Sequence, residues 1–208
     1  MNISKFLLID AVLVIAAIPL LFFLSDSKRK SLLLRSSSKE ELLRKASYKL
    51  PEKEKLKELE KLAKEKGSGI ECDSIIGIWK FISIWKKDID EEDPIFSSLL
   101  RVFSAKIEFK KDLLTKNSTE LSVIASIQFG QFSICFSGSG YLKGKQPLLP
   151  FCLNLIELKA GSNSLLRRSL KEPEDKEKSF FAMIALEEND ELLSARGQGG
   201  DVVIWMKD

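Results

Sequence analysis

Histidine is absent from the 208 residues of this chain, and its absence excludes several classes of chemistry. Ser-His-Asp and Cys-His nucleophile arrangements, histidine metal sites and histidine acid–base catalysis all require an imidazole. An enzyme built on this sequence would have to work with carboxylates, lysines or a bound cofactor. We expect a non-enzymatic protein that holds no cofactor and no metal ion, and an enzyme of this restricted kind is the alternative.

Cysteine is also scarce. The three cysteines, Cys72, Cys135 and Cys152, are odd in number and show no C-x-x-C spacing. This pattern indicates neither a disulfide framework nor a zinc site. A reducing compartment is consistent with it.

A strong excess of one charge sign is missing as well. The chain carries 33 Lys and Arg against 30 Asp and Glu, which gives a net charge of +3. Strong nucleic-acid binding depends on a basic surface, so we expect no nucleic-acid partner. Much of the positive excess lies at residues 28–35, where it is better suited to anionic lipid head groups.

One long apolar run is present, at residues 6–24 (FLLIDAVLVIAAIPLLFFL). At about 1.5 Å per residue, a helix of this length just crosses a hydrocarbon core of roughly 30 Å. We expect an uncleaved membrane anchor, although Asp10 is costly at that depth unless it lies near the interface. A cleaved signal peptide and a buried helix are the alternatives, and no small-x-small cleavage site follows the run.

The charges that flank this run predict its orientation. Only Lys5 and the α-amino group precede it, whereas Lys28, Arg29, Lys30 and Arg35 follow it. By the positive-inside rule, the rest of the chain stays on the cytoplasmic or stromal side of a single-pass protein.

Two helices are expected after a polar, serine-rich spacer. Ser38-Lys39-Glu40-Glu41 has the form of a capping box and predicts a short helix that ends near Leu50. Pro51 and Gly67 bracket a second helix, rich in Lys and Glu. Its narrow apolar stripe consists of Leu56, Leu59, Leu62 and Ala63. We expect a surface helix docked through this stripe, and the alternative is a partner-binding coiled coil.

From Gly77 onward the pattern becomes strand-like. GIWKFISIW is rich in β-branched and aromatic residues, and strict alternation places Trp79, Phe81 and Trp85 on one side. The segment 121–140 also alternates, and its phase flips at Gly130, which predicts a hairpin or bulge there. An acidic loop at 88–93 and a short helix from Pro94 lie between these segments. Further strands are expected at 105–110, 151–158, 164–170, 179–186, 191–195 and 202–206.

About eight or nine short strands without interleaved helices predict an antiparallel barrel or sandwich and exclude a βαβ fold. We divide the chain into three parts. Residues 1–30 form the membrane anchor with its basic flank, 31–70 a linker with charged amphipathic helices, and 71–208 an antiparallel β-barrel domain.

The two ends of the strand region carry short motifs. The region opens with G-x-W at Gly77-Ile78-Trp79, followed by Phe81, and closes with an acidic turn, an Arg-Gly pair and an apolar strand. The closing residues are Asp190, Leu192, Arg196, Gly197, Gly200 and 202–205. On these residues the chain resembles the lipocalin superfamily and, within it, the plastid lipid-associated proteins, also called fibrillins or plastoglobulins, of chloroplasts and cyanobacteria.

The resemblance implies a lipocalin-like antiparallel barrel that holds or hands over a lipid, quinone or carotenoid at a photosynthetic membrane, either thylakoid or plasma membrane. It also implies that Arg196 stacks on the indole of Trp79 to close one end of the barrel. That role would be structural.

An eight-stranded barrel is wide enough for one small ligand. The residues expected to line it are aromatic: Phe81, Trp85, Phe129, Phe132, Phe136, Tyr141 and Phe151. Aromatic residues that alternate along strands more often pack a core than line a pocket, so both interpretations stay open.

Two other patterns are weaker. The acidic run 88–93 lacks the glycine and the terminal glutamate spacing of a calcium-binding EF-hand, and a loop that caps the Pro94 helix explains it better. The segment 196–200 (RGQGG) has no strand before it and no helix after it in the manner of a phosphate-binding loop. A glycine turn explains this segment.

Three functions remain open. The first is a membrane-anchored barrel that binds or hands over a lipophilic molecule, and a dry internal cavity would favour it. The second is a non-enzymatic scaffold or assembly factor for a membrane complex, favoured by a filled barrel and an exposed apolar patch. The third is a chromophore-handling lyase, of the kind also built on lipocalin-like barrels.

Overall fold

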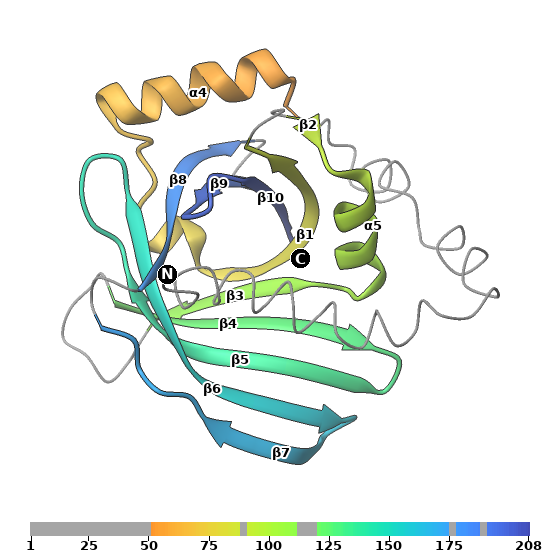
Figure 1. The fold of residues 1–208 in the computed structure, drawn as a ribbon. Coiled ribbons are helices and arrows are strands. Elements are labelled where there is room, and N and C mark those ends of the chain that lie inside the picture. Colours follow the sequence, from red (N-terminus) through yellow and green to blue (C-terminus); the bar gives the residue numbers. More distant parts are fainter. Residues whose placement is uncertain (1–50, 88–90, 112–119, 175–177, 188–190) are drawn as a thin grey trace, which may run out of the picture.

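A computed structural model describes residues 51–87, 91–111, 120–174, 178–187 and 191–208 (Figure 1). The apolar run 6–24, the expected helix ending near Leu50, and Asp190 lie outside these residues. Within the described part of the chain, neither α-helix is long and apolar enough to cross a membrane.

Eight antiparallel strands form a closed ring, which confirms a mainly β protein (Figure 1). Along the ring the order is β1, β3, β4, β5, β6, β8, β9 and β10, and β10 pairs back with β1. The strands span Gly77–Lys86 (β1), Lys106–Lys111 (β3), Glu120–Phe129 (β4), Phe132–Tyr141 (β5), Leu148–Ala160 (β6), Ser179–Glu187 (β8), Leu192–Gly197 (β9) and Val202–Lys207 (β10).

Two further strands lie at the margins. β2 (Glu91–Glu92) pairs with the end of β1, and β7 (Asn163–Ser169) pairs with β6. β6 is shared: Leu148–Phe151 pairs with β8 inside the ring, whereas Leu155–Ala160 pairs with β7. The sheet therefore extends beyond the ring as two hairpins, β4–β5 and β6–β7.

The predicted hairpin at Gly130 is confirmed. Phe129 and Phe132 pair directly across a two-residue turn in which Gly130 adopts φ +58°, a value that favours glycine. Because Phe129 and Phe132 share one face, the apolar alternation changes phase in the sequence but not in space.

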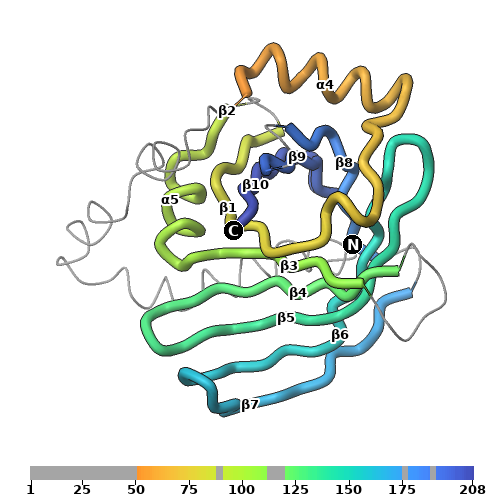
Figure 2. The backbone as a smooth tube through the Cα atoms, turned by 180° about the vertical axis from the view of Figure 1, so that it is seen from behind, coloured from red at the N-terminus to blue at the C-terminus, as the bar shows by residue number. Residues whose placement is uncertain are grey.

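Among the described residues, three helical segments lie next to the ring. α4 (Lys53–Lys66) ends at Gly67, as predicted, and the two views in Figures 1 and 2 place it on the side of the ring opposite β7. α5 (Pro94–Val102) packs against β1. The short 3-10 helix η3 (Asp73–Ile75) leads into β1.

Two apolar clusters lie on the two faces of the ring wall. The larger one is inside the ring, and the smaller one lies outside it, under α4. The smaller cluster joins Leu56 of α4 to Ile82, Ile184, Val202 and Ile204. The predicted docking of the helix through its apolar stripe is therefore confirmed for Leu56, Leu59 and Ala63, whereas Leu62 is 49% exposed.

Candidate functional site

The inside of the ring is packed with large side chains from every ring strand. Each ring strand contributes at least one such residue to a single buried cluster; in ring order they are Trp79, Phe109, Leu121, Phe136, Leu149, Met183, Leu193 and Trp205. Phe81, Phe136 and Phe151, three of the residues expected to line a pocket, belong to this cluster and are 5%, 5% and 8% exposed. Phe151 stacks on Phe181, which meets Trp205 edge to face, at centroid distances of 5.1 and 5.3 Å.

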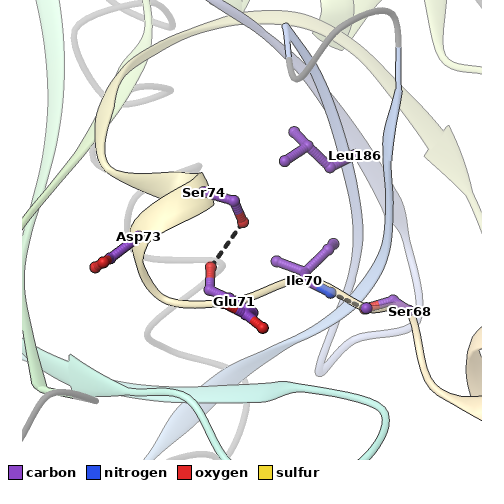
Figure 3. A pocket seen from close by; sticks show the side chains of 7 residues that line it. Ser68, Ile70, Glu71, Asp73, Ser74 and Leu186 are labelled. Atoms are coloured by element: carbon purple, nitrogen blue, oxygen red, sulfur yellow. Dashed lines mark hydrogen bonds between the residues drawn. The ribbon is translucent and has the colours of Figure 1, made fainter.

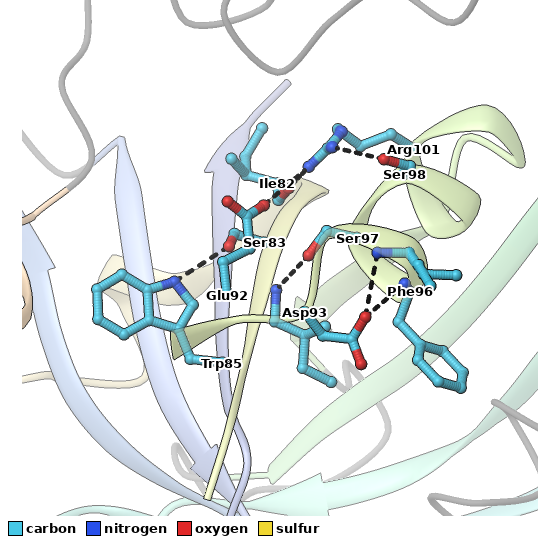
Figure 4. A network of polar contacts seen from close by, with 11 residues as sticks. Ile82, Ser83, Trp85, Glu92, Asp93, Phe96, Ser97, Ser98 and Arg101 are labelled. Atoms are coloured by element: carbon cyan, nitrogen blue, oxygen red, sulfur yellow. Dashed lines mark hydrogen bonds and ion pairs between the residues drawn. The ribbon is translucent and has the colours of Figure 1, made fainter. Parts of the chain in front are cut away.

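Trp85 lies on the outer face of the ring, not on the inner face as expected. The pairing of β1 with β10 shifts register between Phe81 and Ser83, which marks a β-bulge. A bulge reverses the side-chain alternation that follows it. Trp85 consequently packs with the outer cluster and donates its indole N–H to Ser83 Oγ at 3.1 Å (Figure 4). Ile84 belongs to the inner cluster.

Trp79 is fully buried at the start of β1. Its indole N–H donates to the carbonyl oxygen of Ile75 at 2.7 Å, which ties the strand to η3. The ammonium group of Lys207, its cross-strand partner on β10, lies 5.4 Å from the ring centroid. This distance is within the range of a cation–π contact.

Arg196 makes a different contact from the expected stack on Trp79. It pairs with Val202, a member of the outer cluster, so it lies on the outer face of the wall, whereas Trp79 lies on the inner face. Its guanidinium donates to both carboxylate oxygens of Glu60 on α4, at 2.7 and 2.6 Å, and to the carbonyl oxygen of Gly200. Arg196 therefore forms an ion pair with Glu60 in place of the expected stack on Trp79, and this ion pair anchors α4 to β9.

Glu60 was not among the candidate residues of the sequence, and besides Arg196 it pairs with Lys64, one turn further along α4, at 2.8 Å. Burial acts to raise the pKa of Glu60, but hydrogen bonds and charges from Arg196 and Lys64 outweigh it, so the pKa is lowered. The signal was available: Glu60 lies four residues after Leu56 and three before Ala63, which puts an acid on the apolar stripe.

Tyr141 points away from the ring interior. Its neighbour Gly140 shares the inner face with Leu121, and alternation turns Tyr141 outward, where it is 40% exposed. Lys143 lies 5.7 Å from its ring centroid.

Phe129 and Phe132 lie where the inner face continues past the ring. Phe129 lies beyond Ile127 on β4, and Phe132 lies beyond Ile134 on β5, each nearer the turn and on the same face. They are 48% and 50% exposed, and Phe129 also packs on Phe103 at a centroid distance of 5.6 Å. The seven expected ligand-binding residues therefore divide among the ring interior, the outer wall and the open end of the sheet.

A pocket of about 520 Å³ opens beside the segment that precedes β1 (Figure 3). Its lining residues are Ser68, Gly69, Ile70, Glu71, Asp73, Ser74 and Leu186. Two carboxylates and two hydroxyl groups among them suit a polar ligand or water more than a lipophilic molecule. None of the seven expected aromatic residues contributes to it.

The polar network around α5 has a structural role (Figure 4). Asp93 accepts hydrogen bonds from the backbone N–H groups of Ile95 and Phe96 at 3.1 and 3.0 Å, so the expected capping of this helix is confirmed. Ser97, fully buried, accepts the N–H of Ile84 at 3.0 Å, and Arg101 donates to the carbonyl oxygen of Ile82. Asp88 and Asp90 of the acidic run lie outside the described residues.

Within the described ranges, no three Cys, Asp or Glu side chains come close enough together to hold a metal ion. Burial raises the pKa of the Cys72 thiol, as does the neighbouring charge of Asp73, and burial together with Glu172 raises that of Cys152. These shifts disfavour the reactive thiolate form.

Comparison with protein-family models gives no match, and no curated protein is significantly similar to this chain.

Proposed function

We propose that this chain is a non-enzymatic scaffold or assembly factor, tethered by residues 6–24 to a membrane and acting through the outside of a lipocalin-like barrel. The supporting observation is the packing of one large apolar side chain from each of the eight ring strands into a single buried cluster. A ring occupied by its own side chains has its binding surfaces on the outside.

The outward face of α4 is the surface best suited to a protein partner. Leu56, Glu60 and Ala63 hold the helix on the ring, and the opposite face presents lysines and glutamates around the half-exposed Leu62. In such a contact Leu62 would form the apolar centre, and the surrounding charged residues would form the solvent-accessible rim.

Overpacking provides the test of the interior. Phe136 and Phe132 lie on the same face of β5, four residues apart, and are 5% and 50% exposed. We expect Phe136→Trp to lower the free energy of unfolding by about 1–3 kcal/mol, and Phe132→Trp to change it by no more than about 0.5 kcal/mol. Equal tolerance of both substitutions, measured by urea unfolding, would indicate spare room inside the ring and oppose the proposal.

Native electrophoresis of detergent-solubilised membranes tests the partner. The full chain should migrate well above its own mass of 23.5 kDa. A double variant with Lys61→Glu and Leu62→Asp should be released from the complex. The control variant Lys106→Glu, an exposed change on β3, should stay bound. Migration of all three proteins at the monomer position would argue against a scaffold.

A second function, binding of a lipid, quinone or carotenoid, is favoured by one observation. The inner face of the sheet continues past the ring through Ile127, Phe129, Phe132 and Ile134, and this part is not fully buried. Titration with a quinone should then quench the tryptophan fluorescence of the full-length Phe132→Trp variant saturably. The fluorescence of the Phe136→Trp variant should be little affected. The resemblance to the plastid lipid-associated proteins supports this alternative.

A further inference from the structure

Two hairpin turns lie side by side at the open end of the sheet. The N–H of Gly161, in the β6–β7 turn, donates to the carbonyl oxygen of Gln131, in the β4–β5 turn, at 2.7 Å. We call residues 127–134 and 158–168 the hairpin end. Its four largest exposed apolar side chains, Phe129, Phe132, Leu165 and Leu166, are 48% to 57% exposed.

Beyond Glu120, the first residue of β4, the β4–β5 hairpin carries no charge. Between Glu120 and Lys143 the sequence has no Asp, Glu, Lys or Arg, although such residues make up 30% of the chain. Polar positions within the hairpin are serine, glutamine or glycine, whose transfer out of water costs far less than that of a charge. An exposed hairpin of this composition can enter an apolar environment without burying an ion.

The adjoining segment 158–171, which runs from the end of β6 through β7, carries charges of one sign, and Glu157, the residue before it on β6, pairs across the strands with Arg167. Between Glu157 and Glu172 the chain has Lys159, Arg167, Arg168 and Lys171 and no acid. Every residue of β7 is exposed, so Arg167 and Arg168 flank the exposed Leu165 and Leu166. Apolar side chains with adjacent cations match the acyl region and the anionic head groups of a lipid surface.

We propose that the hairpin end docks on the surface of an anionic lipid bilayer, with Phe129, Phe132, Leu165 and Leu166 entering the acyl region and Arg167 and Arg168 contacting the head groups. This proposal rests on the proposed membrane tether. The tether raises the local concentration of bilayer around the domain, so a contact that is weak by itself becomes populated.

Charge complementarity favours a bilayer over a second copy of the chain. Among the described residues, β7 is an edge strand that pairs only with β6, and its only charged residues are Arg167 and Arg168, so two β7 strands from different copies would place four positive charges side by side. Like charges across a strand pair are destabilising. An anionic bilayer instead neutralises these cations.

The position of α4 fits this orientation. α4 lies on the side of the ring opposite β7 in both views of the molecule (Figures 1 and 2). Docking of the hairpin end therefore leaves the outward face of α4 directed away from the lipid and accessible to a protein partner.

The test places tryptophan probes in the full chain, reconstituted in vesicles of phosphatidylcholine and phosphatidylglycerol with brominated acyl chains. Phe132→Trp and Leu166→Trp should lose emission relative to the same proteins in unbrominated vesicles. Tyr141→Trp, a matched probe at the other end of β5, should keep its emission. In the Phe132→Trp protein, Arg167→Gln with Arg168→Gln should weaken the quenching in anionic vesicles, and raising the salt concentration should do the same.

Equal quenching at positions 132 and 141, or quenching at neither, would overturn the docking. A blue shift of Leu166→Trp that depends on protein concentration without lipid would identify a second copy as the occupant and also overturn it. Carbonate extraction reports the tether separately. If carbonate releases the protein and vesicles still quench Phe132→Trp but not Tyr141→Trp, the docking stands and the tether fails.

Discussion

Glu60 on α4 and Arg196 on β9 form a bidentate ion pair on the outer face of the ring, although they are 136 residues apart in the sequence. Nε and Nη2 of the guanidinium lie 2.7 and 2.6 Å from the two carboxylate oxygens. The side chains of Glu60 and Arg196 are only 10% and 23% exposed. A charge-assisted pair of this geometry, shielded from water, is stronger than an exposed surface ion pair.

We expect Glu60→Gln to lower the free energy of unfolding by about 1–3 kcal/mol, because a partly buried guanidinium would lose its counter-charge. Urea unfolding measures this loss. Glu58→Gln, an exposed change on the same helix, serves as the control and should stay within about 0.5 kcal/mol of the unchanged protein. Similar effects of the two substitutions would mean that the ion pair does not hold the helix.

The same carboxylate predicts a dependence of stability on pH. The pKa of Glu60 is lowered in the folded protein, so the unfolded chain binds the proton first as the pH falls. Its contribution is fully present above the usual pKa of a glutamate and is lost as the pH drops through the lowered value. The stability difference between the unchanged protein and Glu60→Gln should therefore shrink between about pH 7 and about pH 3. A difference that grows with acidity would contradict this assignment.

Local signals in the sequence predicted several elements correctly. Gly67 ends α4, Asp93 caps α5 before Pro94, and Gly130 turns the β4–β5 hairpin. In each case the backbone needs a particular residue type at one position, namely a residue that tolerates positive φ or a side chain that accepts N–H groups. Such requirements are visible without knowledge of the rest of the fold.

Long-range features were not predictable in the same way. The bulge after Phe81 arises from the pairing of β1 with β10, and it moves Trp85 to the outer face although strict alternation places it inside. The partners of Arg196 and Trp79 depend on which face of the ring each strand position occupies. Sequence alternation alone does not determine that face once a bulge intervenes.

Gly138 provides a test of the close approach between β5 and β6. A Cβ atom added there would lie 1.8 Å from the carbonyl oxygen of Cys152, where the pairing of the two strands shifts register. Gly138→Ala should lower the free energy of unfolding by more than about 2 kcal/mol, because backbone atoms have to move. Gly199→Ala, which meets no atom within 4 Å, is the control and should have little effect. Thermal unfolding of both variants measures the difference, and a fully stable Gly138→Ala protein would show that the strands are farther apart.

Cys152 should report opening of the fold through its thiol. It is 5% exposed, and burial, with the charge of Glu172, raises its pKa, so little thiolate is available in the folded protein. In a Cys72→Ser and Cys135→Ser background, modification by a disulfide reagent at about pH 7 should be slow and should accelerate at the urea midpoint. Reaction in native buffer as fast as that of the unfolded chain would show that the β6 segment opens freely.

The membrane tether is tested by extraction and by protease protection. The apolar run 6–24 predicts that the full chain resists both high salt and carbonate, because an embedded helix is held by hydrophobic burial and not by charge. A variant lacking residues 1–30 should be released by both treatments. In sealed vesicles whose cytoplasmic face points inward, added protease should spare the ring. Lys28, Arg29 and Lys30 follow the apolar run and favour keeping the rest of the chain on the cytoplasmic side. Digestion of the ring without detergent would reverse the orientation, and release of the full chain by salt alone would show that the run is not inserted.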